Sequence, residues 1–346
     1  MSKQNEGLDS LAESKINNFT LPPEITSINK ANAYIQKNID SLSADFLNSL
    51  LQALSHQSIR GSENDYHNLA TTLARNDLHT VAVEVCKAGL AFYGTNIDLL
   101  ADAIQYTSEC GEFSAAESMQ MTLTEKVDKR FWNWRCFTFL INFYNMLPYS
   151  DSNKETALDL VKTYKETLPY EEKAYMAECE TYERYADHSR AVQAMIDGVD
   201  KCKMAPQCAG HLAEHYLEIG EFQKAIQAAS RALIGNAIPQ PSINTGAVFA
   251  FRGLAYDGII HEKLLQGCQI EDMKSEMENA IHDLKCAMRF GFGQPNIATR
   301  ASILETYLGT QSIDNSLDEK NPDLLSFLKN LSNNPGKDVT DDNVSD

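Results

Sequence analysis

The stretch Pro206–Pro239, PQCAGHLAEHYLEIGEFQKAIQAASRALIGNAIP, decides the fold. Small residues, which let two helices approach closely, stand at Ala213, Ala225 and Ala232. Gly220 permits a tight turn between the two halves of the stretch. Tyr216 and Phe222 flank that turn and are expected to fill the gap between neighbouring helix pairs. The stretch therefore predicts two helices joined by a short turn.

The same pattern recurs along the chain. Alanines followed three to five places later by an apolar residue stand at Ala82, Ala116, Ala157, Ala191, Ala225 and Ala280. The differences between these numbers are 34, 41, 34, 34 and 55, which is a period of 34 with insertions of 7 and 21. Weaker copies begin at Glu63, Ile97 and Glu172, and in the first of these Asp77 replaces the turn glycine. A fixed period of this length indicates a repeat protein.

These copies resemble the tetratricopeptide repeat, a helix-turn-helix unit of about 34 residues. The resemblance covers residues 63–292 as six repeats of uneven quality. It implies an all-α, right-handed superhelical solenoid of antiparallel helix pairs. It also implies a role in binding other proteins, because such solenoids offer extended surfaces to their partners.

The pattern divides the chain into segments that belong to one array. Residues 1–24 are expected to be a flexible leader, and 25–60 an N-terminal helix pair capped by Ser27 and Ser43. The array spans 61–292 and includes an extended helix pair at 246–290. Capping helices are expected within 293–331, at 295–311 and 322–331, and a disordered acidic tail at 332–346.

Composition excludes several classes of function. The 346 residues carry a formal net charge of −18, which disfavours nucleic acid and anionic membranes as partners. The longest apolar run, at 137–147, is about half of the ~20 residues that a membrane span requires, and no apolar leader precedes it. The eight cysteines stand singly, which is typical of reduced thiols in a cytoplasmic protein.

The resemblance also assigns a binding groove to the first helix of each repeat. The groove residues that it implies are Asn64, His67, Thr71, Arg75, Asp98, Gln105, Glu109, Lys173, Glu180, Glu183, Arg184, Gln207, Glu214 and Glu218. Acids predominate among them, which favours a protein or peptide partner of basic or mixed charge. The alternative is that acids are spread over the whole surface of an acidic protein. The clamp for acidic chaperone tails is absent, because His67, Thr71 and Asp102 replace its basic and amide residues.

One metal-like pattern overlaps the best repeat. Residues 211–215 spell HxxEH, an inverted zinc-protease motif, on what is expected to be a repeat helix. Cys202, Cys208, His211 and His215 supply ligand types of a structural zinc site, but the spacing of the two cysteines is long for one. Ordinary packing explains the same residues. We expect no cofactor and no catalytic activity, because no phosphate loop or nucleophile elbow is present.

Two further surfaces have alternative interpretations. The aromatic stretch from Phe131 to Tyr144 is either an anchor for a partner or a helix buried between repeats. Met273 and Met277 lie on one stripe of the extended pair and form either a protruding partner surface or a packing face.

The sequence predicts a non-enzymatic interaction scaffold or adaptor. A peptide-responsive regulator, in which the repeats close around a short peptide and control an output partner, is the alternative. A zinc-binding protein is a third interpretation.

Overall fold

The computed structural model describes residues 20–235 and 244–310, and these contain fifteen α-helices and no β-strand. The all-α helix-pair fold is thereby confirmed. The leader was predicted at 1–24, and residues 1–19 of it lie outside the described residues. The segments predicted at 322–331 and 332–346 also lie outside them. The sequence predicts one array, whereas the contacts group the chain into two compact units, Met1–Leu168 and Pro169–Asp346.

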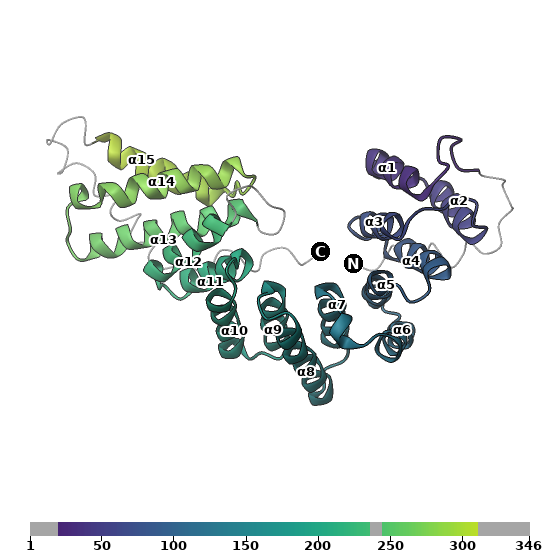
Figure 1. Cartoon of the computed structure of the whole chain (residues 1–346). Coiled ribbons are helices and arrows are strands. Elements are labelled where there is room, and N and C mark those ends of the chain that lie inside the picture. The colour runs from purple at the N-terminus through teal and green to yellow at the C-terminus, as the bar shows by residue number, and fades with distance from the viewer. Residues whose placement is uncertain (1–19, 236–243, 311–346) are drawn as a thin grey trace, which may run out of the picture. The chain divides into compact units, whose positions relative to one another are not determined.

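Unit 1 is built from four consecutive helix pairs (Figure 1). Its helices are α1 (Ile28–Asn38), α2 (Ala44–Ser55), α3 (Glu63–Ala74), α4 (His79–Tyr93), α5 (Ile97–Glu109), α6 (Phe113–Lys126), α7 (Trp134–Met146) and α8 (Asp151–Thr167). The first helices of the pairs, α1, α3, α5 and α7, contact one another in succession. We call this row the first-helix layer of unit 1.

Local sequence sets the helix boundaries of unit 1. The hydroxyl oxygens of Ser27 and Ser43 accept hydrogen bonds from backbone N–H groups in the first turns of α1 and α2, as the sequence predicts. Ser62 and Asp65 form a reciprocal capping box at the start of α3. Asp77 has a φ of +60° in the turn after α3, where the corresponding residues of other repeats are Gly111, Ala186 and Gly220, also with positive φ.

Unit 2 continues the same pairing. Its helices are α9 (Glu172–Arg184), α10 (His188–Lys201), α11 (Pro206–Glu218), α12 (Phe222–Gly235), α13 (Thr245–Leu265), α14 (Lys274–Arg289) and α15 (Pro295–Thr310). The first helices α9, α11 and α13 contact in succession and form the first-helix layer of unit 2. Close approach between pairs depends on Gly198 of α10, where an added Cβ would lie 2.7 Å from Cys208 Sγ.

The extended pair is present, but its methionines do not form a partner surface. Helices α13 and α14 have 21 and 16 residues, compared with 13 in α11. Met273 and Met277 are 0% and 1% exposed. They belong to a core cluster with Leu284 of α14 and Ile297 of α15. The prediction of a protruding methionine surface was wrong, because the core of this pair takes up the stripe.

Neither interpretation of the aromatic stretch holds for all of it. Trp132, Phe137 and Phe143 are buried, and the ring of Phe137 stacks on Tyr164 of α8 at 4.8 Å. Phe131 is 71% exposed because it lies in a short 3-10 turn, Lys129–Phe131, that precedes α7. Three rings of the stretch are therefore core, three are half-buried, and one faces solvent.

Candidate partner-binding faces

The first-helix layer of unit 1 contains a three-residue ionic network. Asp102 of α5 is fully buried, and its Oδ2 lies 2.5 Å from Nδ1 of His67 on α3. Its Oδ1 accepts a hydrogen bond of 2.9 Å from Nη1 of Arg135 on α7. The network therefore joins three consecutive repeats through one carboxylate.

The surroundings of Arg135 restrict where its guanidinium can point. Its Cζ lies 5.0 Å from the ring centroid of Trp134 and 5.8 Å from that of Phe139. Its Nε lies 3.9 Å from Asp98, whose carboxylate also accepts a 2.7 Å hydrogen bond from Asn133. Cation–π contacts and the two acids hold this charge in one place.

Because Asp102 is buried, the loss of its partners would lower the free energy of unfolding. A carboxylate removed from water loses several kcal/mol of hydration, and charged hydrogen bonds have to replace it. The side chains of His67 and Arg135 remain 20% and 18% exposed, so their outer edges reach the surface of the layer. Burial and the Asp102 charge raise the pKa of the neighbouring Tyr106, so this phenol stays neutral.

A second polar group follows along α5. Gln105 donates a 2.6 Å hydrogen bond to Glu109, and Glu109 also lies 2.8 Å from Nδ1 of His79. Tyr106 donates to the hydroxyl of Thr71 at 3.4 Å. These residues tie α3, α4 and α5 together at one end of the layer.

The structure places the expected groove residues of unit 1 in two groups. His67, Thr71, Asp98, Gln105 and Glu109 take part in the contacts above, whereas Asn64 and Arg75 stand at the two ends of α3.

The sequence analysis missed Asp102 and Arg135 as site residues. The available signal was Asp102 itself, a charged residue among Leu99, Ala103 and Tyr106 on the apolar side of its helix.

The first-helix layer of unit 2 has a different character, because its exposed side chains are mainly acids. Glu180 of α9 and Glu214 of α11 stand one repeat period apart, so they occupy the same position in successive repeats. Both are exposed, on helices that contact each other. Glu218 is exposed one turn after Glu214. Desolvation by the surrounding protein raises the pKa of Glu180.

Within the described chain, histidines are the basic side chains that lie nearest to two acids of this row. Glu214 lies 4.0 Å from His211, and Glu183 lies 2.7 Å from His188. Among the described residues, Glu180 and Glu218 form no ion pair. The other expected groove residues, Lys173, Arg184 and Gln207, border the row on α9 and α11.

Beneath this face, Glu172 fixes the start of α11. Its Oε1 accepts a 2.8 Å hydrogen bond from the backbone N–H of Cys208. Desolvation raises the pKa of Glu172, and the hydrogen bonds from Cys208 and Gln207 oppose that shift. Glu172 is therefore a structural acid that links two repeats.

The four zinc candidates do not form a ligand set. Cys202 and Cys208 are buried, whereas the side chain of His211 is 54% exposed. Desolvation raises the pKa of Cys208, which favours the thiol over the thiolate that zinc requires. Among the described residues, no group of three or more His, Cys, Asp and Glu side chains is placed to hold a metal ion. Cys202 and Cys208 therefore belong to the packing core, whereas His211 of the HxxEH motif faces solvent and His215 is half-buried.

Comparison with known proteins gives structural likeness at low identity. No protein-family model matches the chain, and no curated protein matches it. The chain is similar to a thermophilic tetratricopeptide-repeat protein of Thermus thermophilus, with 15% identity and a TM-score of 0.42 over 57% of this chain and 100% of that chain. It is also similar to a tetratricopeptide repeat protein from Parabacteroides merdae, with 16% identity and a TM-score of 0.40 over 79% of this chain and 98% of that chain.

A third similar structure is the APC/C hetero-tetramer Cut9-Hcn1. It has 13% identity and a TM-score of 0.43 over 80% of this chain and 52% of that chain. The tetratricopeptide-like fold follows from this chain's own helix pairs, which recur at a fixed period. None of the described helices is long and apolar enough to cross a bilayer.

Proposed function

We propose that this chain is a non-enzymatic interaction scaffold, whose first-helix layers bind a segment of a partner protein. The observation that carries the proposal is the pair Glu180 and Glu214, exposed at the same position of two contacting repeats. Among the described residues, neither acid forms an ion pair with a lysine or an arginine. A partner segment would supply those side chains. Basic or mixed charge is therefore the partner chemistry that we propose.

Unit 1 would contribute a second contact region of mixed charge. Its network exposes the edges of His67 and Arg135 beside Asp98, whose side chain is 44% exposed. A segment with both signs of charge matches this surface better than a uniformly basic one. All eight cysteines are thiols, which suits a reducing compartment, and we propose the cytoplasm.

A peptide titration tests the proposal. Two labelled peptides of equal length, one with lysine and one with glutamate at alternate positions, are titrated with the full chain at low and high salt. We expect the lysine peptide to bind more tightly and to weaken as salt rises, because exposed charges are screened. Each of Glu180→Gln and Glu214→Gln should weaken it about two- to fivefold, the range for exposed ion pairs.

Asp200→Asn is the matched control, because Asp200 is exposed on the second helix α10. It should leave the affinity of the lysine peptide unchanged. Equal binding of the glutamate peptide, or equal losses in the control and the two test variants, would contradict the proposed acidic face. Peptide-induced compaction in small-angle scattering would instead favour the peptide-responsive regulator.

A further inference from the structure

Cys286 and His282 form a thiol–imidazole pair on the exposed side of α14. The Sγ atom of Cys286 lies 3.6 Å from Nε2 of His282, which stands four residues earlier on the same face of the helix. His282 is exposed and Cys286 is half-buried, so solvent reaches the pair. In this arrangement the imidazole can accept the thiol proton, and the sulfur becomes a nucleophilic thiolate.

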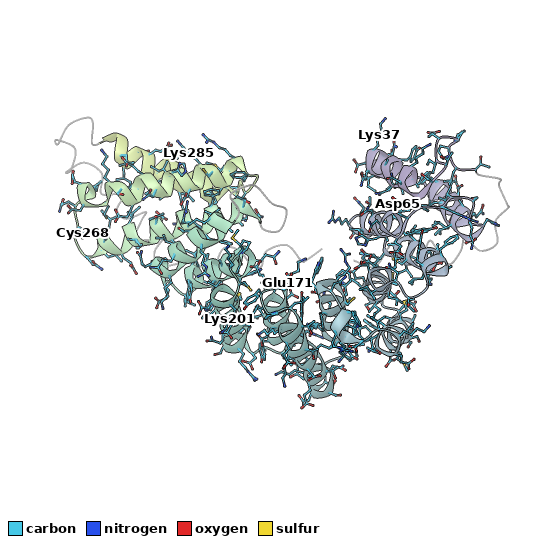
Figure 2. All side chains as sticks on the ribbon, in the orientation of Figure 1. Lys37, Asp65, Glu171, Lys201, Cys268 and Lys285 are labelled. Carbon is cyan, nitrogen blue, oxygen red and sulfur yellow. The ribbon has the colours of Figure 1, made fainter. Side chains whose placement is uncertain are left out.

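Within the described chain, the other two half-buried cysteines have no histidine partner. Cys110 lies 3.7 Å from the hydroxyl of Thr80, which is not a base at neutral pH. Cys268, labelled in Figure 2, lies just beyond the end of α13, and its side chain forms no hydrogen bond to a described residue. All three thiols are half-buried, so the imidazole is the difference that sets Cys286 apart.

A cation lies near the thiol on the neighbouring helix α13. Arg252 donates hydrogen bonds of 2.7 and 2.8 Å to the buried carboxylate of Asp283 and one of 3.2 Å to Ser230 of α12. Asp283 raises the pKa of Arg252 most, and Cys286 adds to that rise, so the guanidinium and the sulfur interact electrostatically. Arg252 thereby offsets the negative charge of Asp283, which alone would oppose a thiolate three residues later.

We infer that Cys286 is a modification site at which a small hydroperoxide oxidises the thiol to a sulfenic acid, with His282 as the proton carrier. The thiol proton passes to Nε2 of His282, and the sulfur attacks one oxygen of the hydroperoxide. The S–O bond forms as the O–O bond breaks, so the sulfur loses two electrons and the peroxide gains them. The departing oxygen takes the proton from His282 and leaves as water when the oxidant is hydrogen peroxide.

Two features favour a hydroperoxide over other electrophiles. The departing oxygen of a hydroperoxide needs a proton, which His282 holds after the first step, whereas an alkyl halide releases an anion that needs none. Cys286 is half-buried, which favours a small reagent. Both residues of the pair belong to a second helix and not to the first-helix layers, so the inference does not rest on the proposed function.

Trapping of the sulfenic acid on the folded full chain tests the inference. The reduced chain is exposed to hydrogen peroxide at neutral pH with dimedone present, and the label at each cysteine is quantified by mass spectrometry. A thiol with the ordinary pKa of about 8.5 is only about 3% thiolate at pH 7, so proton transfer to a neighbour can raise its rate by up to about thirtyfold. We expect Cys286 to be labelled at least about fivefold faster than Cys110 and Cys268.

A matched pair of histidine variants isolates the role of the imidazole. His282→Gln removes the base and should lower the rate at Cys286 to about that of the other two half-buried thiols. His261→Gln changes a histidine of α13 whose Nε2 has no hydrogen-bond partner among the described residues, and it should leave the rate unchanged. Because His282 is exposed, its replacement should also leave amide exchange at 282–290 unchanged. Alkylation by iodoacetamide, which releases iodide without a proton, should depend less on His282 than oxidation does.

Four results would overturn the inference. One is equal labelling of the three half-buried cysteines. Another is a rate at Cys286 that His282→Gln leaves unchanged, or that His261→Gln lowers equally. A third is faster amide exchange at 282–290 in His282→Gln, because it would make the role of this histidine structural. The last is an equal dependence of alkylation and oxidation on His282, because it would remove the reason for a hydroperoxide.

Discussion

Replacing Arg135 by methionine tests whether the buried Asp102 depends on the charge of its arginine partner. Methionine keeps much of the apolar stem of arginine but removes the charge. Asp102, which is fully buried, would then keep only His67 as a side-chain partner among the described residues. Breaking a buried ion pair by removing one partner costs about 3–5 kcal/mol. Because Arg135 is 18% exposed, we expect the low end, a loss of about 3 kcal/mol in the free energy of unfolding.

The two tryptophans make the measurement specific to unit 1. The chain has two, Trp132 and Trp134, and both stand within three residues of Arg135. Urea unfolding followed by tryptophan fluorescence therefore reports unit 1, whereas far-UV circular dichroism reports the helices of both units. With a slope of about 2 kcal/mol per molar urea, the loss lowers the fluorescence midpoint by about 1.5 M.

Arg130→Met is the matched control. Arg130 forms its ion pair with Asp128 at the surface, where its side chain is 81% exposed, so its loss should not move the midpoint measurably. The reasoning about the buried carboxylate is refuted if Arg135→Met and Arg130→Met have equal midpoints. It is also refuted if Arg135→Met lowers the midpoint seen by circular dichroism but not that seen by fluorescence.

Three further predictions concern packing, thiol chemistry and pH. Gly198→Ala should destabilise unit 2 by about 1–3 kcal/mol in urea unfolding followed by circular dichroism, because the new Cβ would lie 2.7 Å from a sulfur atom. Gly210→Ala should instead stabilise unit 2 by about 0.5–1 kcal/mol, because alanine favours the helix more than glycine and the nearest neighbour of the new Cβ would be a methyl group at 3.4 Å. Equal changes in stability for the two substitutions would contradict this description of the packing. A chromogenic thiol reagent should react first with the three half-buried cysteines of the folded chain, which are Cys110, Cys268 and Cys286. A faster reaction of any buried cysteine would refute this order. Binding of the lysine peptide should tighten as pH rises from about 4.3, the ordinary value for glutamate, through the raised pKa of Glu180, because the cation favours the ionised form. Glu180→Gln should flatten that profile in an anisotropy titration, and an unchanged profile would exclude Glu180.

The helix pairs could be predicted from the sequence, because the residues that mark them lie within each pair. The starts expected at Glu63, Ile97, Glu172 and Pro206 are the first residues of α3, α5, α9 and α11. Small residues and turn residues at a fixed period mark each pair without knowledge of its neighbours. For the same reason, the turn at Asp77 was recognised although it lacks glycine.

Contacts between repeats could not be predicted from the sequence, because they depend on how the helices of successive repeats align along one another. Asp102 and Arg135 belong to different repeats, and only the packing of α5 on α7 brings their side chains to 2.9 Å. The methionine stripe failed for a related reason. Periodicity shows that Met273 and Met277 share a face, but not whether another helix covers that face.

The shared carboxylate of Asp102 limits how the repeats of unit 1 can be rearranged. Deletion or duplication of a repeat is tolerated where each repeat contacts only its immediate neighbours. Removing the pair α5–α6 would take away Asp102, the carboxylate that His67 and Arg135 both contact. In unit 2, the junction of the pair α9–α10 with α11 is made by Gly198 against Cys208 and by Glu172, whose carboxylate accepts a hydrogen bond from the backbone N–H of Cys208. An inserted repeat would offer such a backbone N–H itself, so this junction does not depend on a side chain shared by three repeats. New copies would therefore insert more readily after α10 than within the three pairs from α3 to α8 that Asp102 connects.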